Sequence, residues 1–115
     1  MKFFLSSKIF KAVVTSADLN YEGSISIDSS LCRASGLSKG EKVLVVSNTS
    51  GARLETYVIL AKENSGIICM NGAAAHLIKK GEEIIIMGFS LSDKPIDANI
   101  VFVDKNNKIV SVKTK

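Results

Sequence analysis

The chain has 115 residues, of which 46% are hydrophobic and 23% charged. This length allows one compact domain, so we expect a single domain over residues 1–115. The composition excludes an intrinsically disordered chain, which needs few apolar residues and a high net charge. No apolar run approaches the roughly 20 residues of a membrane-spanning helix, and residues 1–5 are too short for a signal peptide. We therefore expect a cytoplasmic protein with no membrane partner.

The net charge is modestly positive, at +4, from 15 basic and 11 acidic residues. The basic residues are dispersed along the chain, and aromatic residues make up only 6%. Nucleic-acid-binding proteins usually concentrate their positive charge on one face and often place aromatic residues within it. The pattern therefore favours a mildly basic surface that attracts small anions, and it predicts no nucleic-acid partner.

Metal-binding and histidine-based sites find little support among the residues. Cys32 and Cys69 form no C-x-x-C pair, and His76 is the one histidine. Zinc needs three or four ligands, and a disulfide-stabilised domain of this size would contain more cysteines. We expect no metal site, and we interpret both cysteines as buried free thiols.

The first expected strand covers Lys8–Thr15, which is rich in β-branched and apolar residues. Regular alternation would place Lys8, Phe10, Ala12 and Val14 on one face. Lys8 then has two interpretations, a strand-end ammonium that extends to water or a cation directed into a pocket. The alternation alone favours the first.

Several further strands are expected, and turn residues at 48–51 and 105–108 predict that four of them form two hairpins. The run of isoleucines within 83–91 is apolar on both faces, which predicts a central strand. The expected strands are Ile25–Ile27, Val43–Ser47, Arg53–Leu60, Ile67–Met70, Glu83–Leu91, Val101–Val103 and Ile109–Val110.

Two short helices are expected. Asp28 is placed to cap a helix over residues 29–34, and Gly36 to end it. Asn71 is placed to cap a second helix over residues 72–77. Several short strands with two helices of one or two turns predict a mainly β fold, a small closed barrel.

The dipeptide Gly23–Ser24 permits an unusual reaction, although most Gly-Ser pairs are simply turns. A serine hydroxyl can attack the carbonyl of the residue before it, which converts the amide into an ester. A preceding glycine helps because it tolerates a strained backbone and leaves the carbonyl unshielded. Elimination of the ester and hydrolysis leave a pyruvoyl group, whose ketone forms a Schiff base with an amine and acts as an electron sink.

Three blocks of sequence carry a resemblance to a known family. They read TSADLNYEGSISID at Thr15–Asp28, GARLETY at Gly51–Tyr57 and NGAAAH at Asn71–His76, with the pair Lys8-Ile9 upstream. Together they closely resemble aspartate 1-decarboxylase, the pyruvoyl-dependent enzyme that makes β-alanine for pantothenate synthesis. Ordered blocks with matching separations are far more specific than one short motif.

The resemblance implies a self-processing enzyme that acts on L-aspartate. It implies cleavage between Gly23 and Ser24, giving a β chain of residues 1–23 and an α chain of residues 24–115. Ser24 would become a covalently bound pyruvoyl group, with no metal and no pyridoxal phosphate. The fold implied is a double-psi β-barrel, assembled as a homotetramer with active sites between subunits.

The resemblance also assigns roles at the site. Tyr57 matches the residue that donates a proton to the carbanion formed when CO2 leaves, which suits a phenol whose pKa nearby cations lower. Thr56 matches a residue implicated in substrate contact and processing, where its hydroxyl can stabilise an oxyanion. Asn71 would orient the pyruvoyl group or the scissile carbonyl.

Substrate binding is expected from two further groups of residues. Gly72, Ala73 and Ala74 would offer backbone amides to a carboxylate at a helix start and leave room for the substrate. Arg53 would bind one substrate carboxylate in a bidentate manner. Lys8 would face the second carboxylate or the forming imine, which replaces its interpretation as a solvated strand end.

Two departures from the family pattern keep alternatives open. Phe10 stands where family members usually have a histidine, and the segment between Phe89 and Ile100 is shorter than usual. The first favours an alternative hypothesis, an unprocessed, non-catalytic relative of the same fold. A small basic β-domain that binds nucleic acid is a weaker alternative.

Overall fold

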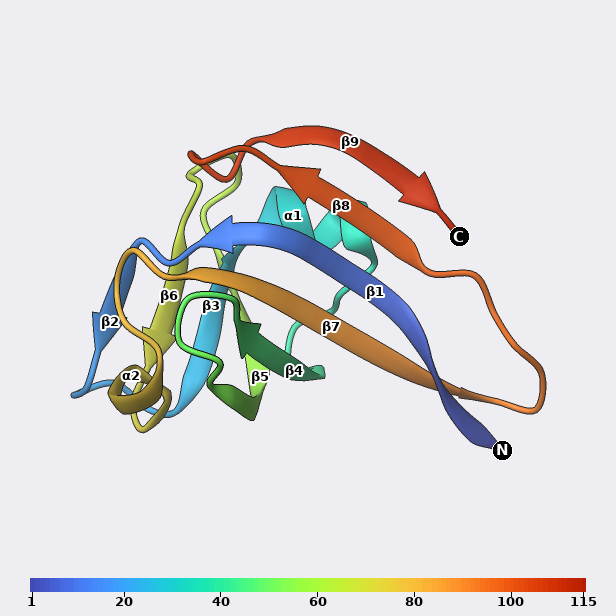
Figure 1. Ribbon diagram of the computed structural model, residues 1–115, viewed down its shortest axis with the longest axis horizontal. Helices are drawn as coiled ribbons and strands as arrows, with labels where there is room; N and C mark the ends of the chain where they lie inside the picture. Colours follow the sequence, from blue (N-terminus) through green and yellow to red (C-terminus); the bar gives the residue numbers. More distant parts are fainter.

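The computed structural model describes residues 1–115, as a mainly β fold of nine strands and two short helices (Figure 1). This confirms the prediction of a mainly β fold with two short helices. Neither helix has the length and apolar character of a membrane-spanning segment. In chain order the elements are β1 (Lys2–Val13), β2 (Ser16–Asp18), β3 (Ser24–Asp28), α1 (Ser29–Ser35), β4 (Lys42–Ser47), β5 (Arg53–Ala61), β6 (Ile68–Asn71), α2 (Ala74–Leu77), β7 (Glu83–Ser92), β8 (Asn99–Val103) and β9 (Ile109–Thr114).

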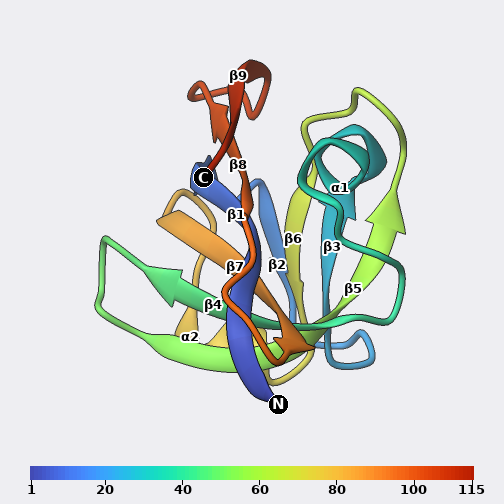
Figure 2. The same ribbon diagram turned by 90° about the vertical axis from the view of Figure 1, so that its right-hand side faces the viewer.

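The strands form one continuous ladder in the order β2-β6-β3-β5-β4-β7-β1-β8-β9. Its end strands, β2 and β9, each pair with one neighbour. Only Val14 and Thr15 separate β1 from β2 in the chain, although five strands lie between them in the ladder. The sheet therefore curls round on itself, as the view at 90° to that of Figure 1 shows (Figure 2). At the junction the Val14 amide donates to Glu82 and the Thr15 amide to Ile68.

The core lies inside this curl and contains 18 buried apolar residues. Alternating side chains of the strands supply most of it, because every second residue of a strand points to the same face. Its largest fully buried members are Ile9, Ile25, Ile27, Leu31, Ile68, Met70, Ile78, Ile84 and Ile86.

Most of the local predictions are confirmed. Helix α1 begins after Asp28, whose carboxylate accepts from the Ser30 amide, and it ends at Gly36 with a left-handed φ of 84°. The turns at 48–51 and 105–108 join antiparallel pairs, β4 with β5 and β8 with β9. Strand β7 lies inside the ladder between β4 and β1, as its isoleucines predict.

The predicted alternation of β1 is wrong beyond Ile9. A bulge interrupts the pairing of β1 with β7 between Ile9 and Ala12, and Lys11 within it has a φ of 64°. Because the bulge inserts one extra residue, Ile9 and Ala12 both point into the core. Lys8 and Phe10 therefore lie on the face opposite to that of Ala12.

The second helix is shorter than predicted, and its cap is not the one expected. Asn71 ends β6, and α2 begins at Ala74 after Ala73, with no side-chain capping bond. The Asn71 side chain points instead toward β3. The fold thus directs this amide to the start of β3, where Ser24 lies.

Candidate active site

Ser24 is the first residue of β3, and its side chain is fully buried. It pairs with Asn71 of β6 in the antiparallel ladder. On the other side of β3, the parallel pairing of Ile25 with Val58 places Tyr57, in the middle of β5, beside Ser24. Three predicted residues from distant parts of the sequence therefore meet at one end of β3.

The Asn71 carboxamide holds the Ser24 hydroxyl. Its Nδ2 donates to Ser24 Oγ at 2.8 Å and to Ser26 Oγ at 2.9 Å. The Cys69 thiol donates to Asn71 Oδ1 at 3.1 Å. The Ser24 hydroxyl makes a longer contact of 3.4 Å to the Glu22 carbonyl. The serine is thus fixed by a buried amide and not exposed to solvent.

Gly72 lies against the backbone of Gly23. Its φ is +67°, and a Cβ atom there would come within 2.8 Å of Gly23 Cα and of the Tyr21 carbonyl oxygen. Gly23 itself does not have a positive φ. The Gly72 amide donates to the Asp18 carbonyl at 2.7 Å, so it is already occupied, which differs from the carboxylate-binding role expected for it. In the structure Gly72 provides space for the Gly23–Ser24 segment.

A cavity of about 400 Å³ opens beside this segment. It brings together six of the residues that the sequence singles out. The lining residues are Gly23, Leu54, Glu55, Thr56, Tyr57, Asn71, Ala73, Ala74 and Leu77. Because Tyr57 is 40% exposed while Asn71 is buried, the cavity runs from solvent down to the start of β3.

The two predicted substrate-binding cations are not among the lining residues. Lys8 is half-buried in the middle of β1, with Nζ 5.3 Å from the centre of the Phe10 ring. Arg53 is exposed at the start of β5, three residues before Thr56. A single chain therefore supplies the serine, amide, threonine and tyrosine of the site without these cations.

The other end of β3 is anchored by Asp28. Burial raises the pKa of its carboxyl group, but hydrogen bonds from Ser30, Gly66 and Asn64 outweigh this effect and hold the pKa below its usual value. The carboxylate thereby ties α1 to the turn before β6. Strand β3 is fixed at both of its ends.

Both cysteines are free thiols, as predicted, but the prediction that both are buried is wrong for Cys69. Burial, with Asp28 and Glu41 nearby, raises the pKa of Cys32 to about 12, so this thiol stays protonated. Cys69 is half-buried and contacts Asn71.

Two residues of the site, Ser26 and Cys69, were not identified from the sequence. Alternation along strands was the signal that could have found them. Ser26 lies two residues after Ser24, and Cys69 two residues before Asn71, so each shares a strand face with a predicted residue.

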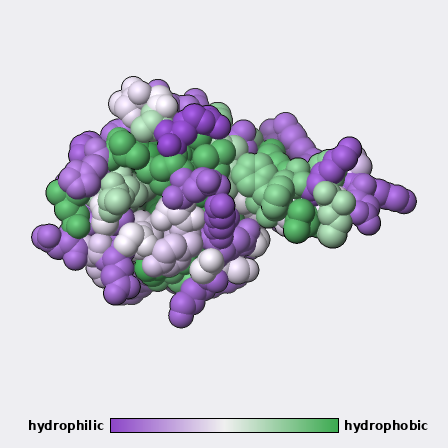
Figure 3. Space-filling view, turned by 90° about the horizontal axis from the view of Figure 1, so that it is seen from below, coloured by the Kyte–Doolittle hydropathy of each residue, from purple (hydrophilic) through white to green (hydrophobic).

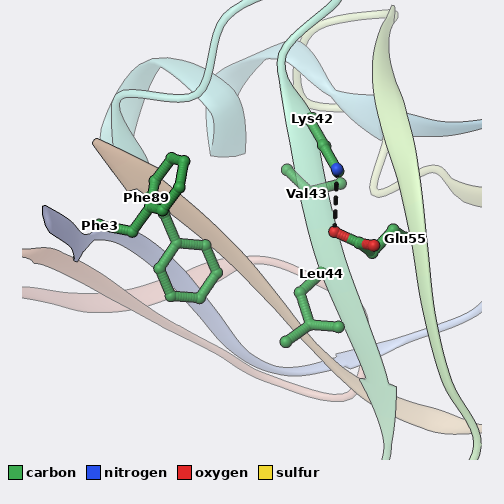
Figure 4. Close-up of a pocket in the computed structure, with 6 residues that line it drawn as sticks. All are labelled: Phe3, Lys42, Val43, Leu44, Glu55 and Phe89. Carbon is green, nitrogen blue, oxygen red and sulfur yellow. Dashed lines mark ion pairs between the residues drawn. The ribbon is translucent and has the colours of Figure 1, made fainter. Parts of the chain in front are cut away.

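A second cavity of about 340 Å³ shares only Glu55 with the first (Figure 4). Phe3 of β1 and Phe89 of β7 lie together on one side of it, and on the other Lys42 Nζ and Glu55 Oε2 form an ion pair at 3.2 Å. Val43 and Leu44 complete the lining. Four of its six lining residues are apolar.

The site thus lies in a mainly β domain and consists of a buried serine that follows a glycine and is bound by Asn71, with Tyr57 at the adjoining cavity. Comparison with known proteins identifies one family. The sequence model described as aspartate decarboxylase matches residues 1–110. Aspartate 1-decarboxylases of Corynebacterium efficiens and Clostridium botulinum are each 50% identical to the chain, over 97% and 94% of its length and 85% and 90% of their own. The chain belongs to the aspartate decarboxylase family.

Proposed function

We propose that this chain is a self-processing aspartate 1-decarboxylase, which converts L-aspartate to β-alanine and CO2 for pantothenate synthesis. The observation that carries the proposal is the buried Ser24, which is held by Asn71, a residue that lines one cavity together with Gly23 and Tyr57. This arrangement joins the bond to be cleaved to the groups that the later reaction needs.

The first reaction cleaves the chain. Ser24 Oγ attacks the Gly23 carbonyl carbon, the peptide C–N bond breaks, and an ester forms while the Ser24 nitrogen is released as an amine. Loss of the Ser24 Cα proton then expels the Gly23 carboxylate, and water replaces the nitrogen as ammonia, leaving a pyruvoyl group. Asn71 Nδ2, which donates to Ser24 Oγ, would stabilise negative charge that develops there, and Thr56, which lines the cavity, would supply a hydroxyl to the oxyanion of the attacked carbonyl. The products are residues 1–23 and 24–115.

The surroundings of position 24 fit a pyruvoyl group. The position is closed to solvent, Asn71 Nδ2 is a donor for a carbonyl oxygen, and Ala73 and Ala74 leave the adjoining cavity open. The pyruvoyl ketone supplies a centre that bonds the substrate amine and accepts the electron pair left when CO2 departs. Asn71 would hold and orient this group.

The remaining steps depend on side chains at the cavity and beyond it. Tyr57 lines the cavity and is partly exposed, so its phenol can donate a proton to the substrate carbon and recover one from water. Aspartate has two carboxylates, for which Arg53 and Lys8 are the complementary cations.

Lys8 and Arg53 lie outside the cavity that Gly23, Tyr57 and Asn71 line. We therefore infer that a neighbouring copy of the chain completes the site within a homotetramer. Apolar side chains support such an assembly. They gather along the narrow extension formed by the start of β1 and the end of β7 (Figure 3). Met1, Phe3, Phe89 and Leu91 are exposed there, beside the second cavity. A patch of this kind is typical of a protein–protein interface.

The family fold, a closed double-psi β-barrel, is also part of the proposal. Its support is the connection of β1 to β2 across five strands of the ladder, which requires the sheet to curl. The parallel pairs β2–β6 and β3–β5 fit such a crossed arrangement. The cytoplasmic location stays a prediction.

The test is the intact mass of purified protein together with its reaction on L-aspartate. We expect two fragments, 1–23 and 24–115, the larger with a pyruvoyl mass, and release of CO2 and β-alanine. The Ser24→Ala variant is the control and should remain whole and inactive. One uncleaved wild-type mass, or decarboxylation by Ser24→Ala at the wild-type rate, would contradict the proposal.

A further inference from the structure

Four polar side chains form a square on one face of the β3–β6 pair. The ladder sets Ser24 opposite Asn71 and Ser26 opposite Cys69. Because Ser24 and Ser26 are two residues apart, as are Cys69 and Asn71, all four point to the same side. The square connects a thiol to the serine of the reaction through one carboxamide.

The orientation of that carboxamide decides whether Asn71 donates a hydrogen bond to the Ser24 hydroxyl or accepts one from it. With Nδ2 toward β3, Asn71 donates to Ser24 Oγ and can stabilise negative charge on it. With Oδ1 toward β3, Asn71 would accept a hydrogen bond from the Ser24 hydroxyl and stabilise its neutral form instead. The first orientation favours attack on Gly23, and the second opposes it.

The Cys69 thiol selects the first orientation. Both Nδ2 hydrogens are used by Ser24 and Ser26, and Asn71 is 3% exposed, so water has little access to Oδ1. The one hydrogen bond that Oδ1 receives comes from Cys69 Sγ, at 3.1 Å. In the flipped amide, Oδ1 would accept from the two hydroxyls, but both Nδ2 hydrogens would face the thiol sulfur, which is only a weak acceptor. A donor at position 69 therefore favours the amide orientation that cleavage needs.

We propose that Cys69 is a positioning residue for self-cleavage, whose thiol fixes the Asn71 carboxamide on Ser24. The proposal rests on the proposed cleavage of the Gly23–Ser24 bond. Cys69 acts through Asn71 and is not a catalytic residue, since its contacts are with Asn71 and the Met70 carbonyl.

The test follows the cleavage rate of freshly synthesised chains by intact-mass spectrometry. We expect Cys69→Ala to cleave about tenfold more slowly, less than the 100- to 1000-fold that loss of a direct oxyanion donor costs. Cys69→Ser keeps a donor at this position and should cleave within about twofold of wild type. Cys32→Ala is the matched control, because it removes a thiol that has no contact with Asn71, and it should leave the rate unchanged.

Two further measurements separate positioning from a general structural effect. Unfolding temperatures are compared in the uncleavable Ser24→Ala background, where Cys69→Ala should match Cys69→Ser. In an Asn71→Ala background, Cys69→Ala should cause no additional slowing. A Cys69→Ala chain that cleaves at the wild-type rate, or that slows further without Asn71, overturns this proposal alone. A wild-type chain that never cleaves overturns the proposed function as well.

Discussion

Ser24 and Arg53 stand on neighbouring strands, β3 and β5, in opposite surroundings. Ser24 is fully buried, paired with Asn71 and enclosed by the Gly72 turn. Arg53 is exposed and forms no ion pair within the chain. Lys8 resembles Arg53 in lying outside the cavity, with an aromatic ring as its neighbour.

The difference in burial between Ser24 and the two cations indicates that self-cleavage and substrate binding depend on different parts of the protein. Cleavage of the Gly23–Ser24 bond needs atoms of one chain held rigidly, and the interior of a single domain provides this rigidity. Binding of a dianionic substrate needs cations at an accessible surface, which a neighbouring subunit can supply. We therefore expect substitutions to divide into those that stop cleavage and those that spare cleavage but impair turnover.

The largest effect on turnover is expected from Tyr57→Phe, which removes the proton donor and keeps the ring. The rate of decarboxylation should fall by about 1000-fold, within the range for loss of a general acid. Cleavage should proceed normally, because the phenol oxygen is not needed to hold Ser24. Steady-state kinetics and intact masses of the same preparation measure both. Normal turnover with phenylalanine would refute the role of Tyr57.

The next largest effect should come from Gly72→Ala. Its new Cβ would displace the Gly23 backbone, and cleavage should slow by about 100-fold, as expected for a misplacement near 1 Å. Gly51→Ala is a matched control, since Gly51 has a φ of +80° but open space around it. Both variants incur backbone strain, so equal cleavage rates in the two would show that contact with Gly23 is unimportant.

Arg53→Ala is expected to lower kcat/KM for aspartate by about 10- to 100-fold, the value of a hydrogen-bonded charge. Cleavage should continue at the wild-type rate, because Arg53 lies outside the cavity beside Gly23. Arg33→Ala, which breaks an exposed ion pair with Glu63, is the control and should leave kinetics unchanged. Equal kinetics in the two arginine variants would remove Arg53 from substrate binding.

The smallest effect expected is on stability, from Asp28→Asn at the far end of β3. The amide would place Nδ2 against the Gly66 N–H, and loss of that bond should lower the free energy of unfolding by about 1–2 kcal/mol at pH 7. The folded-state pKa of Asp28 is lowered, so its stabilisation is present above its ordinary pKa of 3.8 and is lost as the pH falls through the folded value.

Urea unfolding at pH 7 and at pH 3 measures this effect. The gap in the free energy of unfolding between wild type and Asp28→Asn should narrow at the lower pH. At pH 3, below the ordinary pKa of 3.8, unfolding of the wild type is favoured by proton uptake at Asp28, because the folded-state pKa is lower. A gap that stays constant between the two pH values would contradict the role given to the Asp28 charge.

Local signals in the sequence predicted much of the fold. Asp28 and Gly36 mark the two ends of α1 because capping depends on adjacent residues alone. The bulge at Lys11 was not predicted, since alternation gives no indication of one inserted residue. Asn71 was expected to cap α2, but a buried partner on β3 competes for the same amide, and that competition is visible only after folding.

The candidate site likewise contains residues that the sequence identified and contacts that only the structure shows. The family resemblance identified Ser24, Thr56, Tyr57 and Asn71, and the structure brings them together. It could not indicate that Gly72 makes room for Gly23, because this contact joins residues 49 positions apart. The sequence also could not indicate that Lys8 and Arg53 lie outside the cavity, because that depends on how the strands pair in the folded chain.

We infer that one chain contains every group that it needs to cleave itself. Intact-mass spectrometry of freshly synthesised protein, followed over time at several concentrations, tests this inference. We predict a first-order rate of cleavage between residues 23 and 24 that is the same at every concentration, while decarboxylation per cleaved chain rises as subunits associate. A cleavage rate that increases with concentration, or active protein with this bond intact, would contradict it.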